Sequence, residues 1–303
     1  MKKFTPHLLS LLCGILCVLV LFGGFFAAFA SSADSEQSEL KTISIWQIDS
    51  FEGGKGSRAE YLRSIGEKFA KEENVYIEVT SLSLDAAAEN LKRGVSPDMI
   101  SYGAGACGLE SYVNQDYPAE AWCRGGYCLL SLETDDFSAA NSQNTVINAG
   151  KNNLTGAAAL FCGLYGADIL QPTSAYVNLI NGNYKFLLGA QRDIVRLMVR
   201  GVNFYVKPIT EFNDLYQYIS VLSSGEKGWL CGKFTEFLLK NGESVSDICL
   251  FCDGYKLYDN ALSCMEGLSF DYKMPALVSE GFKNGVTQAI KDCDTEKLKS
   301  LLK

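Results

Sequence analysis

The segment 43–58 constrains the fold of this chain more than any other. It starts with an apolar run, Ile43–Ile48, that has the composition of a buried strand, and continues into a polar, glycine-rich loop. The pattern of Arg58–Lys71 then predicts a helix. A strand that leads through such a loop into a helix begins an α/β unit, and polar groups at this junction form ligand-binding crevices. An ordinary buried strand with a solvated turn is the alternative interpretation.

Strand and helix patterns continue to alternate behind this segment. We expect further strands at 75–82, 99–102, 122–130, 145–147, 184–188, 204–206 and 216–222, and helices at 84–93, 155–164, 174–179, 192–200, 233–240, 275–292 and 295–302. Such alternation favours right-handed crossovers between parallel strands. The sequence therefore predicts an α/β fold.

The N-terminus has the pattern of an export signal. Lys2 and Lys3 are followed by an almost continuous apolar run over residues 8–30, and the first acidic residue is Asp34. A signal peptide cleaved after Ala30 fits this pattern. The run of 23 residues is also long enough to span a bilayer, which takes about 20 residues, so an uncleaved membrane anchor is the alternative. Both interpretations place the rest of the chain outside the cytoplasm, either secreted or anchored to the outer face of the membrane.

Charge and histidine content exclude several functions. Lys2 and Lys3 are the only Lys, Arg, Asp or Glu residues before residue 31, so the remainder has 25 basic and 35 acidic side chains and a formal net charge of −10. Such a charge disfavours nucleic acid and anionic lipid as partners. The only histidine is His7, which excludes Ser-His-Asp and Cys-His catalysis and nearly every catalytic zinc site in the exported part. We expect no catalytic residue, no cofactor and no metal.

Nine cysteines follow Ala30, an odd number, so at least one is unpaired in a monomer. Cys249 and Cys252 have the spacing of a redox or metal pair, although no second pair and no exported histidine completes a zinc site. Cys123 and Cys128 are close enough in sequence for a short-loop disulfide. The sequence leaves open whether this disulfide forms.

Six blocks of the sequence follow one another in a characteristic order: Trp-Gln-Ile-Asp-Ser-Phe-Glu-Gly-Gly at 46–54, Ser-Arg at 57–58, Pro-Asp-Met-Ile-Ser-Tyr-Gly at 97–103, Trp122 with Gly-Gly-Tyr at 125–127, Gly-Ala-Gln-Arg-Asp at 189–193, and Phe-Asn-Asp-Leu-Tyr-Gln-Tyr at 212–218. Taken together, they resemble the family 1 extracellular solute-binding proteins, the sugar-capturing receptors of bacterial ABC importers. No single block is specific to this family. Their common order carries the resemblance.

This resemblance implies a two-lobed periplasmic-binding-protein-like α/β fold, with a ligand cleft between the lobes and three crossovers of the chain. Residues 1–30 would be the signal peptide or anchor and 31–41 a linker. Lobe 1 would comprise 42–121 plus 217–262, and lobe 2 would comprise 122–216 plus 263–303. The second lobe is short for this family, and Ala190 stands where a threonine is expected.

The resemblance also implies which residues bind the ligand. A sugar needs charged or amide groups around its hydroxyls and an aromatic platform beneath its ring. The expected rim residues are Asp49, Glu52 and Arg58 in lobe 1 and Gln191, Arg192 and Asp214 in lobe 2, and the expected platforms are Tyr102, Trp122, Tyr127 and Tyr216. Core packing is the alternative for each aromatic residue, a helix-start pair for Arg192, and a turn cap for Asp214.

The function implied is a non-enzymatic, extracytoplasmic receptor that captures a carbohydrate and docks on the permease subunits of an ABC importer. It would contact the membrane through its N-terminal segment if that segment is uncleaved. A secreted glycoside hydrolase is the main alternative, because two opposed carboxylates about 5–9.5 Å apart suffice for that chemistry. A third possibility is a degenerate binding module without a role in transport.

Overall fold

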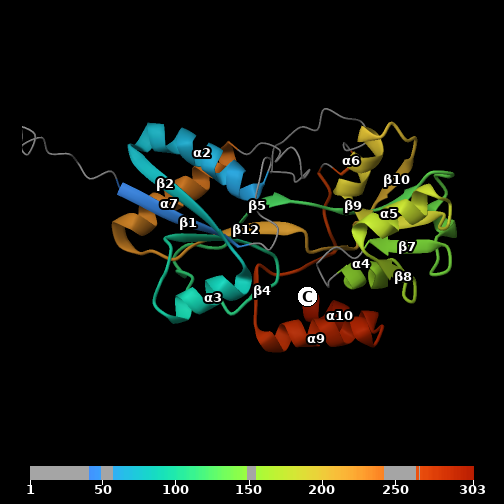
Figure 1. The fold of residues 1–303 in the computed structure, drawn as a ribbon. Coiled ribbons are helices and arrows are strands. Elements are labelled where there is room, and N and C mark those ends of the chain that lie inside the picture. Colours follow the sequence, from blue (N-terminus) through green and yellow to red (C-terminus); the bar gives the residue numbers. More distant parts are fainter. Residues whose placement is uncertain (1–40, 49–56, 149–154, 242–263, 266) are drawn as a thin grey trace, which may run out of the picture. The chain divides into compact units, whose positions relative to one another are not determined.

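The structure is a computed structural model, and it describes residues 41–48, 57–148, 155–241, 264–265 and 267–303. The elements from Thr42 onward belong to one compact unit. Two five-stranded sheets organise this unit, and each is covered by helices (Figure 1). The N-terminal apolar segment, the loop 49–56 and the pair Cys249 and Cys252 lie outside the described residues.

The first sheet has the strand order β2 (Val75–Leu82), β1 (Lys41–Ile48), β3 (Met99–Gly103), β12 (Tyr216–Val221) and β5 (Glu120–Arg124). Strand β1 runs parallel to β3, as the alternating pattern predicts. Strand β12 runs antiparallel to both of its neighbours, β3 and β5. The sheet is therefore mixed.

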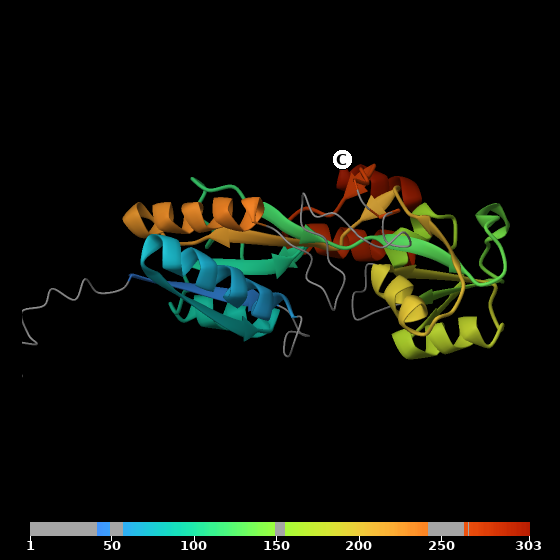
Figure 2. The same ribbon diagram turned by 90° about the horizontal axis from the view of Figure 1, so that it is seen from above.

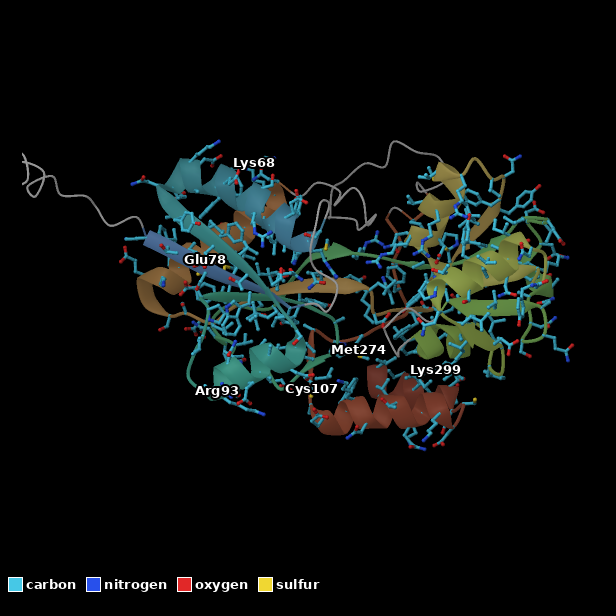
Figure 3. All side chains as sticks on the ribbon, in the orientation of Figure 1. Lys68, Glu78, Arg93, Cys107, Met274 and Lys299 are labelled. Atoms are coloured by element: carbon cyan, nitrogen blue, oxygen red, sulfur yellow. The ribbon has the colours of Figure 1, made fainter. Side chains whose placement is uncertain are left out.

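Helices cover both faces of the first sheet. Helices α2 (Arg58–Glu73) and α7 (Gly225–Lys240) pack on the face that carries Ile45, Met99 and Val221. Helix α3 (Leu84–Lys92) packs on the opposite face, against Trp46 and Ile100. Figures 1 and 2 show α2 and α7 together on one side of this sheet. Figure 3 shows Lys68 of α2 and Arg93, which follows α3, on opposite sides of it.

The second sheet has the order β10 (Tyr205–Pro208), β6 (Tyr127–Ser131), β9 (Phe186–Ala190), β7 (Thr145–Asn148) and β8 (Asp168–Leu170). One face packs on helices α5 (Pro172–Ile180) and α6 (Gln191–Val199). The other face packs on α4 (Thr155–Phe161), α9 (Glu280–Lys291) and α10 (Thr295–Leu302). Strand β7 is parallel to β8 and β9, whereas β6 is antiparallel to β9 and β10.

Two short strand pairs and one 3-10 turn complete the described elements. Strand β11 (Phe212–Asn213) pairs with β13 (Tyr272–Lys273), and β4 (Ala106–Cys107) pairs with β14 (Leu277–Val278), both in parallel. The turn η1 covers Phe137–Ala139. The strand pairs connect the C-terminal segment to earlier parts of the chain.

The single strand predicted at 122–130 is wrong, because the chain forms β5 in the first sheet and β6 in the second. The break falls at Gly125 and Gly126, where the chain packs against Gln191. A Cβ on Gly125 would lie 2.7 Å from Gln191 Nε2, and the Gly126 N–H donates to Gln191 Oε1 at 2.9 Å. Because Trp122 belongs to β5, the first sheet extends past the expected lobe boundary at residue 121. The division into lobes stays a prediction.

Two helical segments also differ from their predicted bounds. Helix α7 starts at Gly225 instead of residue 233, and its glycines let Tyr117 pack closely against it: a Cβ on Gly232 would lie 2.9 Å from the Tyr117 ring. The segment 275–292 contains β14 before α9 begins. The predicted strand at 75–82 and helix at 295–302 are confirmed at their predicted bounds.

The short-loop disulfide between Cys123 and Cys128, which the sequence left open, is not formed in the structure. Cys128 is a buried free thiol on β6 in the second sheet, whereas Cys123 lies on β5 in the first sheet. Burial raises the pKa of the Cys128 thiol well above its ordinary value. Across the ranges that the structure describes, no three His, Cys, Asp or Glu side chains are grouped to hold a metal ion. None of the helices in these ranges is long and apolar enough to cross a membrane.

Asp98 connects β1 to the segment that leads into α7. Its carboxylate accepts hydrogen bonds from the Ser44 backbone N–H at 2.8 Å and from the Ser223 hydroxyl at 2.6 Å, and it pairs with Lys227 Nζ at 3.0 Å. Burial acts to raise the pKa of Asp98, but the bonds from Ser223, Ser44 and Lys227 outweigh it and hold this pKa below its ordinary value. The ionised carboxylate therefore stabilises the folded state.

We predict that Asp98→Asn lowers the free energy of unfolding by about 2 kcal/mol at pH 7, because charge-assisted hydrogen bonds are lost. A carboxyl whose folded-state pKa is depressed stabilises the fold above its unfolded pKa, and this contribution is lost as the pH falls through the folded pKa. The difference between variant and wild type should therefore shrink below about pH 4. Thermal unfolding between pH 3 and pH 8 measures this, with exposed Asp116→Asn as the control. A difference that stays constant with pH would contradict the prediction.

Candidate functional site

Gln47, Arg58 and Gln217 lie at the end of the first sheet where the parallel strands β1, β3 and β5 have their C-terminal ends. Helix α2 starts beside them, and Ser57 caps it by accepting a hydrogen bond from the Glu60 N–H at 3.1 Å. Arg58, the first residue of α2, donates from Nη1 to Gln217 Oε1 on β12 at 2.5 Å. The strand–loop–helix pattern of the sequence predicted this junction and the position of Arg58 within it.

The Arg58 guanidinium is half-buried and lies within electrostatic range of a second arginine. Burial lowers its pKa to about 10; the neighbouring Cys123 acts to raise this pKa, and the positive charge of Arg192 acts to lower it. Arg58 is still charged at neutral pH. The starts of α2 and α6 therefore bring two guanidinium groups toward the same region.

Two of the predicted platform residues lie in the core of the first sheet. The Tyr102 ring is fully buried, its hydroxyl shares a hydrogen bond of 2.7 Å with Ser220 Oγ, and burial raises its pKa to about 12. The Trp122 ring is 2% exposed and stacks on Tyr61 with ring centroids 5.6 Å apart. The Trp122 Nε1–H donates to Ser101 Oγ at 3.0 Å. In this structure both rings pack as core residues.

Three further predicted residues are buried near the start of the second sheet. Gln191 and Gly126 form two hydrogen bonds with each other. The Gly126 N–H donates to Gln191 Oε1, and the Gln191 backbone N–H donates to the Gly126 carbonyl at 3.2 Å. The Tyr127 hydroxyl donates to Asp214 Oδ1 at 2.7 Å. These bonds fix the path of the chain between the two sheets.

Arg192 and Tyr216 are the predicted residues that keep more of their side chains accessible. Arg192 is exposed in the first turn of α6. Tyr216 is half-buried at the start of β12, where its ring meets Phe270 edge-on at 6.3 Å and lies 5.7 Å from Lys273 Nζ. Asp49 and Glu52 lie outside the described residues. The contact roles of all ten predicted residues stay predictions.

Sequence reasoning missed Gln47 on β1 and Gln217 on β12. Both side chains are buried, and Gln47 lies in a strand that is apolar at Ile43, Ile45, Trp46 and Ile48. One signal was available: Ile43, Ile45 and Gln47 alternate along one strand, so they lie on the same face. A polar residue at the third of these positions marks the place where the apolar core of that face ends.

No protein-family model matches this chain. No curated protein matches it either. Solved structures do match. Apo FutA2 from Synechocystis PCC6803 has 9% sequence identity and a TM-score of 0.56, with 87% of this chain and 99% of that chain covered. The PBP AttC of Agrobacterium tumefaciens C58, in an open unliganded conformation, has 10% identity and a TM-score of 0.52, with 87% and 100% covered.

These similarities show that the chain has the two-lobed α/β fold of periplasmic binding proteins. The fold expected from the sequence is thus confirmed. The comparisons do not support the narrower assignment to the sugar-binding family 1, because identities near 10% carry no information about the ligand.

We predict that Tyr102→Phe lowers the free energy of unfolding by about 1 kcal/mol, because the buried Ser220 hydroxyl loses its partner. Tyr76→Phe is the matched control, since the Tyr76 side chain is 57% exposed. Urea or thermal unfolding measures both variants. Equal stability of the two variants would show that the Tyr102 hydroxyl bond does not contribute to the fold.

Proposed function

We propose that this chain is a receptor that binds a small solute outside the cytoplasm and delivers it to the permease subunits of an ABC importer. The observation that carries this proposal is the contact between Arg58 and Gln217, which places a guanidinium at the C-terminal ends of parallel strands and at the start of a helix. Ligands of open α/β sheets bind in this position. The periplasmic-binding-protein fold and the apolar N-terminal segment support the same function.

Within this function, we propose a carbohydrate as the solute. The sequence resemblance to sugar receptors is the support for this class. Arg58 and Arg192 would bind hydroxyl groups from the two lobes, and Tyr216 would provide an apolar platform. Asp49 and Glu52 would complete the rim. Tyr102, Trp122, Tyr127, Gln191 and Asp214 would position these groups from beneath.

The hydrolase alternative receives no support from the buried carboxylates of the described residues, which are Asp98, Asp193 and Asp214. A general acid needs a raised pKa, whereas the pKa of Asp98 is lowered. Asp193 accepts from the Asn148 amide at 2.8 Å and from Arg196 at 3.0 Å, and Asp214 accepts from Tyr127. Such partners suit structural carboxylates. We therefore expect a bound sugar to be recovered unchanged.

Arg192→Ala tests the proposal at an exposed position. We predict at least about tenfold weaker sugar binding, because a charge-assisted hydrogen bond is worth about 1.5–3 kcal/mol, and almost no change in stability. A panel of neutral mono- and disaccharides, screened by thermal shift and then by calorimetry on the full chain, supplies the measurement. Arg93→Ala is the control, since Arg93 is exposed on α3's side of the first sheet and pairs with Glu89.

Three results would count against the proposal. If no member of the panel binds, the carbohydrate class is wrong. If Arg192→Ala and Arg93→Ala bind a sugar equally well, the assignment of Arg192 is wrong. Release of reducing ends from a bound oligosaccharide at enzyme-like rates would favour the hydrolase instead.

A further inference from the structure

Gln47 is fully buried, yet neither its Oε1 nor its Nε2 has a hydrogen-bond partner among the described residues. Gln217 is 1% exposed, and its Nε2 also has no partner within the described part of the chain. Burying an unsatisfied amide costs about 1–3 kcal/mol, and the great majority of buried polar groups avoid this cost. By contrast, Gln191 is equally buried and is bonded to Gly126.

The two glutamines lie on the same face of the first sheet. Gln47 pairs in register with Ser101 on β3, and Gln217 pairs with Gly103, two residues further along β3. Paired residues of neighbouring strands project to the same side, as do residues two apart along one strand. Since strands lie about 4.8 Å apart and rise about 3.3 Å per residue, Gln47 is diagonally adjacent to Gly103.

Gly103 leaves open space between these amides. No described atom lies within 4 Å of a Cβ built on Gly103, and its backbone is not in the left-handed region that favours glycine. The nearest polar group of the same face is already used, because the Ser101 hydroxyl accepts from Trp122 Nε1. The unpaired amides therefore flank a position that a small group of another molecule can occupy.

Apart from Ser101, which is bonded to Trp122, the part of this face beneath α2 and α7 is apolar, which makes the two amides costly for the fold. Ile45, Met99, Ile219 and Val221 pack beneath α2 and α7, and a leucine at position 47 would extend that core. Departures from such a pattern that reduce stability are expected at functional sites. The stability that the fold loses by burying the Gln47 and Gln217 amides is therefore explained if these amides bind a ligand.

The donors and acceptors define the chemistry of that ligand. Arg58 can only donate, so the Gln217 atom that faces it is Oε1, which leaves Nε2 as an available donor. Gln47 offers both a donor and an acceptor. A carboxylate would satisfy the donors but not Gln47 Oε1, whereas a hydroxyl group both donates and accepts.

We propose that Gln47 and Gln217 form a subsite beside Gly103 that binds a hydroxyl group of a neutral, polyhydroxylated solute. This inference rests on the receptor function proposed above and adds two residues that lie within the sequence motifs but were not among the predicted ligand-binding residues. Arg58 acts as a positioning residue for Gln217, because its bond to Oε1 holds the amide with Nε2 free to donate.

The first test requires no ligand. We expect Gln47→Leu to raise the thermal midpoint of the full chain by about 2–4 °C, because it removes an unsatisfied buried amide and adds apolar contacts. Gln191→Leu is the matched control and should lower the midpoint, because it breaks the bond to Gly126. A lower midpoint for Gln47→Leu would show that the Gln47 amide is satisfied within the fold and would overturn the subsite.

The second test measures binding by calorimetry, with the panel of neutral mono- and disaccharides and with glucuronate and galacturonate as their charged counterparts. Gln47→Leu should weaken sugar binding at least about tenfold, the equivalent of about 1.4 kcal/mol. Gly103→Val fills the open space and should also weaken binding at least about tenfold. Its control, Gly281→Val in the exposed first turn of α9, should bind as wild type does.

The outcomes separate this inference from the proposed function. Sugar binding that survives both Gln47→Leu and Gly103→Val would overturn the subsite while the receptor function stands. Binding of the uronates without their neutral counterparts would overturn the neutral class. If no probe binds the wild type, the carbohydrate class proposed above is wrong, and the subsite fails with it, even if Gln47→Leu is more stable.

Discussion

Burial of both faces of each sheet is the constraint on which the rest of the structure depends. Helices α2 and α7 cover one face of the first sheet and α3 covers the other, so almost every side chain within its strands must be apolar or fully paired. Polar groups that serve another molecule can then lie only where strands end. Arg58, Gln217 and Gln47 lie at such an end, whereas Ile45 and Met99, further back on the same face, form the core.

The sequence was most informative where a pattern repeats locally. Strand 75–82 and helix 295–302 were predicted at their bounds because each shows one clear period. The segment 122–130 carries one local sign of its division between two sheets, the Gly-Gly pair at 125–126, which the prediction of a single strand did not use. That division depends on Gln191, which is distant in sequence and holds Gly126. The first two turns of α7 were missed because glycines lower helix propensity, while their packing against Tyr117 is a tertiary effect.

In the candidate site, too, local sequence patterns were predictive, whereas contacts between distant residues were not foreseen. Arg58 and Arg192 were predicted because each opens a helix directly after a strand and its loop. Trp122 and Tyr102 were predicted as ligand platforms on the strength of motifs, but the structure gives each a hydrogen-bonded partner within the core. Gln47 was missed because β1 contains other polar residues, Thr42 and Ser44, and the sequence does not show which of them is buried without a partner. Its importance became visible only when the register showed that no neighbour satisfies it.

The position of β12 also determines when the first sheet can form. Residues 216–221 lie between β3 and β5, which come from the first 124 residues of the chain. Until β12 has been synthesised, β5 has no neighbour in this sheet, and β3 has only β1. Long-range strand pairing of this kind delays folding until distant segments meet. The first half of the chain therefore cannot complete this sheet until residues 216–221 have been synthesised.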